Sequence, residues 1–294
     1  MAVDALRLGR KRPRGTSRVV RGRQLRPGSI VRVLYILLFI LFLLVPLYWV
    51  AVTSIKPSDD LLANPPVWFP AHPTLLHYTT SLKHMRGWLG LKNSLIIASS
   101  VTVLAVLIGS SAAYSMARFR TGGKNLAFWV LSQRFMPPIA VVIPVFLMFR
   151  TLGLTDSRIG LILLYTVFAL PFTIWMMYAY FRQMPVELEE AALVDGCSRW
   201  QALWKVAWPL AAPGIVSAGA FAFIFSWTEF LLSLFLTNSI RTLPVKITTF
   251  VTSTGSEWGF ISALGTSAVI PSFIFILLVQ KQLVRGLTLG SLKE

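Results

Sequence analysis

The sequence predicts an all-α membrane protein with six transmembrane helices. The chain has 294 residues, of which 55% are hydrophobic and only 13% are charged. Soluble domains carry about 25% charged residues, so this chain is unusually apolar. A helix needs about 20 mainly apolar residues to cross a bilayer. The stretches that satisfy this length are roughly 33–53, 93–116, 126–149, 160–181, 212–236 and 261–283.

The segment before the first predicted span, residues 1–32, is a basic arm. It contains 10 of the 28 Lys and Arg residues and a single acid, Asp4. Such a block is typical of a disordered cytoplasmic segment near anionic lipid. Nucleic-acid binding is the alternative, but no folded module surrounds the arm, so we expect membrane lipid and no nucleic acid as its partner. The apolar run that follows is long enough to span, which disfavours a signal peptide. The predicted organisation is therefore an arm over 1–32 and a transmembrane domain over 33–294.

Two ionisable residues fall inside predicted spans, where charged groups are costly and often functional. Arg134 lies in the third span beside Pro137 and Pro138, which favour a kink. Its side chain either lines a substrate path or braces neighbouring helices. Glu229 lies in the outer part of the fifth span, where helix bracing or contact with another subunit is the alternative to ligand contact. Arg134 and Glu229 are the substrate-path candidates.

The distribution of Lys and Arg predicts the orientation of the spans. With a cytoplasmic N-terminus, 19 basic residues lie on the inner side and 8 on the outer side, and Arg134 lies within the membrane. Both termini are then cytoplasmic. The outer segments are residues 54–92, expected to be stiff and partly extended because of their prolines, a short link near 150–159, and residues 237–260. Residues 252–259 of the last segment are rich in turn-forming residues.

The loop over residues 182–209 departs from this charge pattern, because it holds four acids and three bases. Pro185 is suited to the first position of a helix, and Gly196 permits the positive φ that ends one. Ser198 and Gln201 form a capping box that starts a second helix. Apolar residues at helical spacing then form one stripe, which consists of Trp200, Leu203, Trp204, Ala207 and Trp208. The loop is predicted to be a helix–turn–helix unit on the cytoplasmic side.

The sequence shows no signature of an enzyme. There is no G-x-x-x-x-G-K-[ST] segment to hold the phosphates of ATP. His72, His77 and His84 lack metal-ligand spacing, so we expect neither a metal site nor a bound cofactor in this chain. Cys197 is the only cysteine, which excludes an intrachain disulfide.

The loop resembles the EAA motif of the membrane subunits of ATP-binding-cassette (ABC) importers, which reads E-A-A-x-x-D-G-A and is followed by Pro-x-x-x-Pro. The matching residues are Glu190, Ala191, Ala192, Asp195, Gly196, Pro209 and Pro213, with Cys197 in the place of the usual Ala. Further segments resemble the carbohydrate-importer permeases of the maltose-permease type: residues 93–96, 112–118, 152–154, 227–230 and 284–290. Thr228 departs from the family's commonest W-N-E-F form.

This resemblance implies a type I ABC importer permease fold with a cytosolic coupling helix, in a multi-pass protein of the bacterial cytoplasmic membrane. It implies that Glu190, Ala191, Ala192, Asp195 and Gly196 couple the chain to an ATPase. The implied partners are a second related permease, two cytosolic ATPase subunits that bind ATP and Mg, an extracytoplasmic solute-binding protein, and a sugar or polyol substrate.

Two other functions remain to be weighed against this one. An ion-gradient-driven secondary transporter generally has two related halves and midplane ion sites, and neither is visible in the sequence. A membrane-bound scaffold without transport is the other alternative. Which sugar, polyol or glycerol phosphate derivative is carried does not follow from the residues.

Overall fold

The computed structural model describes residues 27–288 except 124 and 254, and most of these residues are helical. The chain divides into two compact units between Leu47 and Tyr48. The described part of the first unit belongs to one helix, α1 (Pro27–Thr53). This helix begins earlier than the predicted residue 33, at a proline, which is favoured in the first helical turn. Residues 1–26 of the predicted basic arm lie outside the described residues.

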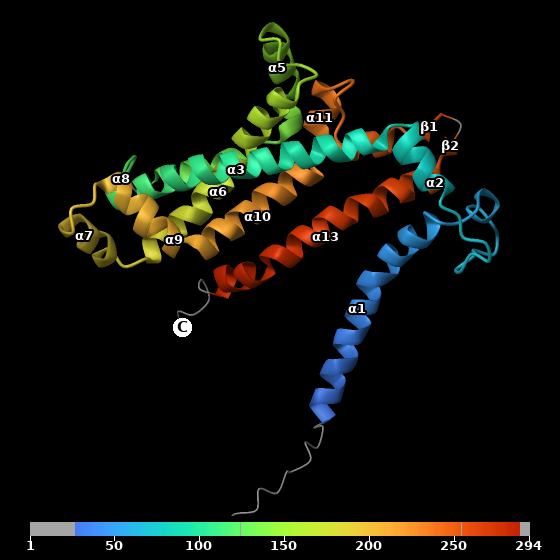
Figure 1. The fold of residues 1–294 in the computed structure, drawn as a ribbon, viewed down its shortest axis with the longest axis horizontal. Coiled ribbons are helices and arrows are strands. Elements are labelled where there is room, and N and C mark those ends of the chain that lie inside the picture. Colours follow the sequence, from blue (N-terminus) through green and yellow to red (C-terminus); the bar gives the residue numbers. More distant parts are fainter. Residues whose placement is uncertain (1–26, 124, 254, 289–294) are drawn as a thin grey trace, which may run out of the picture. The chain divides into compact units, whose positions relative to one another are not determined.

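Four long helices of the second unit form a bundle. They are α3 (Gly87–Phe119), α6 (Arg158–Gln183), α10 (Ala212–Thr228) and α13 (Trp258–Thr288). Helix α3 packs along α6 and α10, and α10 also packs against α13 (Figure 1). The helices approach closely at Gly109 of α3, where an added Cβ would lie 2.7 Å from Cγ2 of Thr173 in α6. Such close packing between small residues stabilises helix pairs in lipid, where apolar surface is not driven together by water.

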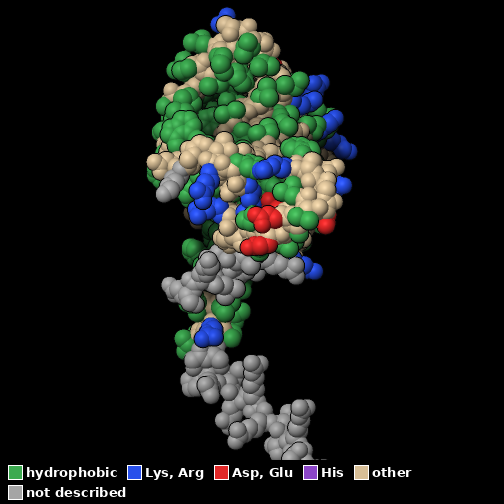
Figure 2. Space-filling model, turned by 90° about the vertical axis from the view of Figure 1, so that its left-hand side faces the viewer, with side chains coloured by type: hydrophobic (Ala, Val, Ile, Leu, Met, Phe, Trp, Pro, Cys, Tyr) green, Lys and Arg blue, Asp and Glu red, His purple; other side chains and the backbone are tan. Residues whose placement is uncertain are grey.

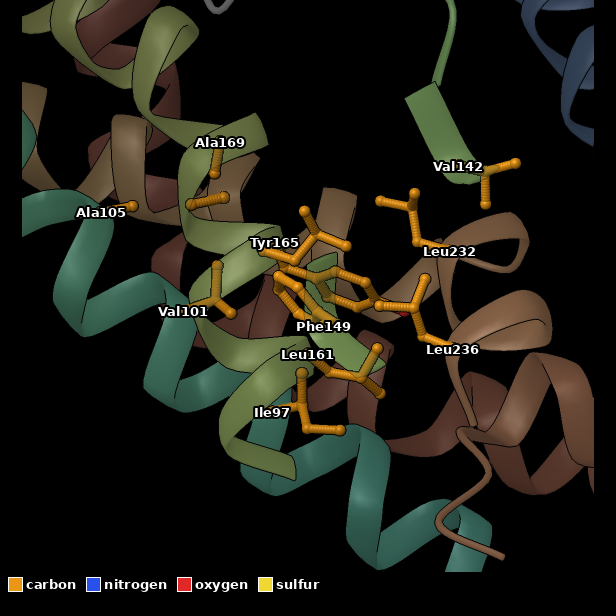
Figure 3. Close-up of a cluster of buried hydrophobic side chains, with 12 residues drawn as sticks. Ile97, Val101, Ala105, Val142, Phe149, Leu161, Tyr165, Ala169, Leu232 and Leu236 are labelled. Carbon is orange, nitrogen blue, oxygen red and sulfur yellow. The ribbon is translucent and has the colours of Figure 1, made fainter. Parts of the chain in front are cut away.

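Buried apolar side chains from distant parts of the sequence meet along this bundle. In one cluster, shown in Figure 3, Ile97 of α3 and Tyr165 of α6 lie near Phe149 of α5 (Pro138–Thr151). Leu232 and Leu236 of α11 (Leu231–Leu236) close the same cluster. A second cluster joins α3 and α6 to the loop over residues 182–209. The loop is therefore packed onto the bundle through apolar contacts.

Two of the predicted spans are interrupted. In the third, α4 (Leu126–Ser132) and the 3₁₀ turn η3 (Gln133–Phe135) are followed by α5, and the two parts are bent by 90°. Pro138 begins α5, so the predicted kink is present. The fifth predicted span, 212–236, ends as a continuous helix at Thr228, and α11 starts only at Leu231. The break was missed because the apolar residues continue across it.

By length and composition, four helices of the described chain are suited to cross a membrane: Val31–Thr53, Gly87–Phe119, Arg158–Gln183 and Trp258–Gln282. Two bent pairs qualify as well, the α4–α5 pair and the pair of Arg199–Leu210 with Ala212–Thr228, which is bent by 80°. Six spans result if each pair counts as one. The predicted number of six depends on that reading and stays a prediction.

The outer segment between α1 and α3 is more helical than its prolines predict. Helix α3 begins at Gly87 rather than at residue 93, and short helical turns precede it. His77 is buried, and its Nε2 lies 2.8 Å from the backbone oxygen of Lys56. In the last outer segment, the predicted turn is a short hairpin of two strands.

The remaining short elements outside the loop over 182–209 are η1 (Ser58–Asp60), α2 (Leu76–Tyr78), η2 (Thr79–His84), α12 (Leu243–Thr248), β1 (Val251–Thr252) and β2 (Gly255–Ser256).

Candidate functional site

The coupling loop, residues 182–209, contains two short helices around a turn, as predicted. Helix α7 (Glu187–Val194) is terminated by the turn at Gly196, whose φ is +87°. The N–H of Cys197 donates to Ala192 O at 3.0 Å, and the N–H of Gly196 donates to Leu193 O at 3.1 Å. These two bonds are those of a Schellman motif, which satisfies carbonyls that a helix end leaves free. Pro185 lies two residues before α7, not at its first position.

The second helix of the loop starts at the predicted capping box. Ser198 Oγ accepts from the N–H of Gln201 at 3.3 Å, and Gln201 Oε1 accepts from the N–H of Ser198 at 2.9 Å. Helix α8 (Arg199–Ala202) passes into the π-turn η4 (Leu203–Ala207) and then α9 (Trp208–Leu210). Within the predicted stripe, Leu203 and Ala207 are buried, while Trp200 remains 62% exposed.

The predicted coupling residues lie mostly on the outer surface of the loop. Glu190, Ala191, Asp195 and Gly196 are exposed, and Ala192 is buried beneath them. Figure 2 looks at the end of the molecule that carries α7 and α8, and it shows acidic side chains gathered there with Lys and Arg around them. The exposed surface is thus acidic at its centre, and Ala192 lies buried on the other side of α7.

A buried acid next to the predicted set anchors α7. Glu189 is only 4% exposed. Its Oε1 accepts from Arg118 Nε at 2.8 Å, and its Oε2 accepts from the hydroxyl of Tyr114 at 2.7 Å. Nη2 of Arg118 lies 2.7 Å from the same Oε1 and donates to Met184 O at 3.3 Å. A buried charge requires such pairing, because its loss of hydration is otherwise uncompensated. The anchor therefore ties the coupling loop to the C-terminal end of α3, which is its predicted inner end.

Sequence reasoning selected Glu190 and missed Glu189. Two signals were available. Glu189 and Ala192 are three residues apart and so share one face of α7. Tyr114 and Arg118 are four residues apart, which places both side chains on one face of α3.

Arg134 faces an open cavity between η3, α6 and α10. The cavity has a volume of about 340 Å³. Its lining residues come from η3, α6 and α10: Arg134, Phe168, Ala169, Phe172, Thr173, Phe221, Ala222, Ile224 and Phe225. Arg134 Nη1 donates to Phe168 O at 3.1 Å, and its guanidinium carbon lies 4.3 Å from the centre of the Phe225 ring. One arginine thus lies among four phenylalanine rings.

Glu229, the second path candidate, caps a helix. Its Oε1 accepts from the N–H of Leu232 at 2.9 Å, and its Oε2 accepts from the N–H of Ser233 at 3.3 Å. Both donors belong to the first turn of α11, where free N–H groups favour a carboxylate. The side chain therefore stabilises the turn between α10 and α11.

At the opposite end of the bundle, polar residues join three segments. Asn93 Oδ1 accepts from Arg158 Nε at 2.9 Å, and Asn93 Nδ2 donates to Arg241 O at 3.0 Å. Ser94 Oγ accepts from the N–H of Leu243 at 2.8 Å. These bonds connect the N-terminal part of α3, its predicted outer end, with the start of α6 and with the segment before α12.

Asp156 holds the neighbouring loop through uncharged donors. Its Oδ1 accepts from the N–H groups of Asn238, Ser239 and Ile240, and its Oδ2 accepts from the hydroxyl of Ser239. Partial burial raises the pKa of Asp156, but these hydrogen bonds outweigh it and hold the pKa below its usual value.

Within residues 27–288, leaving aside 124 and 254, no group of three or more His, Cys, Asp or Glu side chains is arranged to hold a metal ion.

Comparison with known proteins identifies the family. The model of the family described as "binding-protein-dependent transport system inner membrane component" matches residues 105–289, which is more than half of the chain. The chain belongs to this family. It is a membrane permease subunit of an ABC importer, which confirms the predicted family. It is a transport subunit rather than an enzyme, and the ATPase is a partner protein.

Two relatives match most of this permease. The sulfoquinovosyl glycerol transport system permease protein of Agrobacterium fabrum is 38% identical over 253 residues, covering 85% of this chain and 89% of that protein. The diacetylchitobiose uptake system permease protein DasC of Streptomyces coelicolor is 35% identical over 255 residues, covering 85% of this chain and 92% of that protein.

A solved structure shares the fold of the permease. It is that of a bacterial ABC transporter involved in the import of the acidic polysaccharide alginate, with a TM-score of 0.74 and 24% identity. The match covers 88% of this chain and 98% of that chain. The predicted type I ABC importer permease fold is thereby confirmed. The family match, to an inner membrane component, makes the chain an integral protein of the inner membrane.

Proposed function

We propose that this permease carries a saccharide or polyol and that its coupling loop docks on a cytosolic ATPase. Both reported relatives are named for the transport of saccharides, which supports the substrate class. The docking proposal rests on the way in which α7 is held in place. A Schellman motif and a buried ion pair fix the helix, and this leaves Glu190 and Asp195 exposed on its outer side.

In this proposal, Glu190, Ala191, Asp195 and Gly196 form the docking surface, and Ala192 supports it from below. A rigid acidic helix suits a groove with basic residues on the partner, because complementary charge favours association and orientation. Two ATPase subunits would bind ATP and Mg, and this chain would hold no cofactor. A second related permease would complete the path, and an extracytoplasmic solute-binding protein would deliver the substrate.

Arg134 is proposed to line the substrate path. For Glu229 we favour a structural role at the path's edge, since both carboxylate oxygens accept backbone N–H groups.

Substitutions in the docking surface test the proposal. We expect Glu190→Lys to abolish uptake in cells that contain the complete importer, because it reverses charge at the interface. Gly196→Pro should have the same effect, since proline fixes φ near −65° while Gly196 has a φ of +87°. Both variants should remain in the membrane but lose co-purification with the ATPase. Asp59→Lys, an exposed acid outside the loop, is the matched control. Normal uptake by both loop variants would refute the docking proposal.

Labelling of the only cysteine tests the orientation. We propose that both termini and the coupling loop face the cytoplasm of a bacterial cell. A membrane-impermeant maleimide should then modify Cys197 only after the cells are permeabilised. Modification in intact cells would place the loop outside and would overturn both the orientation and the docking proposal.

A further inference from the structure

The cavity around Arg134 combines features that fit an oxygen-rich ligand. Its lining residues are mostly apolar, and four of them are phenylalanines. Rings of Phe172 and Phe221, from α6 and α10, meet edge to face with centroids 4.9 Å apart. A volume of about 340 Å³ falls at the lower end of the range for small-molecule sites, which is about 300–1,000 Å³. In such sites, a few polar groups orient a ligand that apolar walls enclose.

Arg134 provides the polar group and has hydrogen-bonding capacity to spare. A guanidinium has five N–H donors. The described contacts of Arg134 are the bond to Phe168 O and the stacking on Phe225. The Phe225 ring supports the guanidinium from one side and accepts none of its conventional hydrogen bonds, so donors remain for a ligand. A planar group with two parallel donors suits two neighbouring oxygen atoms of a ligand.

The position of the cavity also favours a path-lining role. Phe168 and Thr173 lie near the middle of α6, which runs from Arg158 to Gln183. Arg134 lies where the α4–α5 pair is bent by 90°. Within a membrane, an interrupted helix is tolerated where it is buried in protein or lines a water-filled cavity. The side chain of Arg134 is exposed, which agrees with a helix break that lines a water-filled cavity.

We propose that this cavity is a saccharide subsite carried by the present permease itself. One face of a sugar ring packs its C–H groups on the phenylalanine rings, chiefly Phe172 and Phe221. Two adjacent oxygens of the sugar accept hydrogen bonds from Arg134. This inference rests on the proposed saccharide substrate. It goes further in assigning a direct contact with the sugar to this chain.

An apolar helix of a second permease is a poorer occupant of the cavity. It would remove water from the guanidinium without offering acceptors to the unused N–H groups, and unpaired buried donors are costly. A sugar presents hydroxyl or carboxylate oxygens at the required spacing. Neutral and acidic sugars both offer a pair of neighbouring oxygens, which belong to a vicinal diol in the first and to the acidic group in the second.

The test uses the complete importer in proteoliposomes, with saturating binding protein loaded with a neutral disaccharide or with its uronic acid counterpart. We expect Arg134→Gln and Phe172→Leu each to lower the uptake rate about tenfold, the order of one lost charge-assisted contact. Arg134→Lys should recover only part of the loss, because lysine lacks the planar pair of donors. Phe172→Tyr should recover most of it, since the ring is retained.

Two controls separate a sugar contact from a structural role. Phe273→Leu changes an exposed ring of α13 that is not part of the cavity lining, and it should import normally. Subunit co-purification and ATP hydrolysis without substrate should be unchanged in the cavity variants, so that ATP consumed per imported sugar rises. A larger loss for the uronic acid sugar assigns the oxygens to an acidic group, and equal losses assign them to hydroxyls.

Wild-type kinetics in Arg134→Gln and Phe172→Leu would overturn the subsite while leaving the proposed function intact. Loss of assembly in both cavity variants would also overturn it, in favour of a packing role. If the wild-type importer moved no saccharide at all, the proposed substrate class itself would be wrong.

Discussion

The two ends of α3 are fixed by different chemistry. At the inner end, Arg118 and Tyr114 hold Glu189, a carboxylate that is 4% exposed and directly ion-paired. At the outer end, the uncharged side chain of Asn93 bridges Arg158 and a backbone carbonyl, and no carboxylate takes part in these two bonds.

This difference determines how much stability is lost when the contact at each end of α3 is broken. Breaking a buried ion pair leaves a charge without compensation, and the cost is large. At the outer end, removal of Asn93 leaves no buried charge, because its partners are the exposed Arg158 and a backbone carbonyl, so the cost is smaller. The coupling loop is thus attached by a buried ion pair in addition to its apolar contacts, whereas hydrogen bonds of Asn93 and Ser94 attach the outer segments.

The largest effect is expected at the inner end. Glu189→Ala should lower the free energy of unfolding by about 3–5 kcal/mol, because Arg118 would remain buried without its partner. Thermal unfolding of the purified subunit in detergent measures this. Glu187→Ala removes an exposed acid of the same helix and should change stability by less than about 0.5 kcal/mol.

A double-mutant cycle sharpens that prediction. Glu189→Ala combined with Arg118→Met removes both charges, so the pair should be destabilised by less than the sum of the single variants. Additive losses would show that the two side chains act independently, and the inner end would then resemble the outer one.

A smaller effect is expected at the outer end. Asn93→Ala removes the bonds to Arg158 and Arg241 O and should cost about 1–3 kcal/mol, since Asn93 is 3% exposed and leaves a carbonyl unpaired. The same unfolding measurement applies. Ser111→Ala, which removes an exposed hydroxyl of α3, is the control. A loss as large as that of Glu189→Ala would contradict the contrast between the ends.

The smallest effect depends on pH. The pKa of Asp156 is lower in the folded state than its usual value, so the ionised carboxylate stabilises the fold at pH above about 4. This contribution is lost as the pH falls through the lower, folded-state pKa. Asp156→Asn should therefore be less stable than the wild type at pH 7, and the difference should shrink below pH 4. A difference independent of pH would exclude ionisation as its cause.

Local sequence signals predicted the coupling loop well. The Gly196 turn and the Ser198–Gln201 capping box depend on neighbouring residues only, and both are present. The kink next to Arg134 followed from Pro137 and Pro138 for the same reason. Helix ends that depend on tertiary packing were predicted less accurately, as the earlier starts of α1 and α3 illustrate.

Contacts between distant residues could not be predicted from the pattern. The spacing of Glu189 and Ala192 places both on one face of α7, but it does not identify Arg118, 71 positions away, as the partner of Glu189. The break after Thr228 was hidden because hydropathy does not report a carboxylate that caps a following helix. The ring-lined cavity required the pairing of α6 with α10, which hydropathy does not specify either.

The length of α3 gives these two attachments a joint consequence. Its 33 residues form one uninterrupted rod of about 50 Å, with the Glu189 contact near one tip and the Asn93 contacts near the other. If the coupling loop tilts, the rigid α3 would tilt with it, and its N-terminal end would be displaced. The segment before α12, which is bonded to that end, would then move when the coupling loop moves.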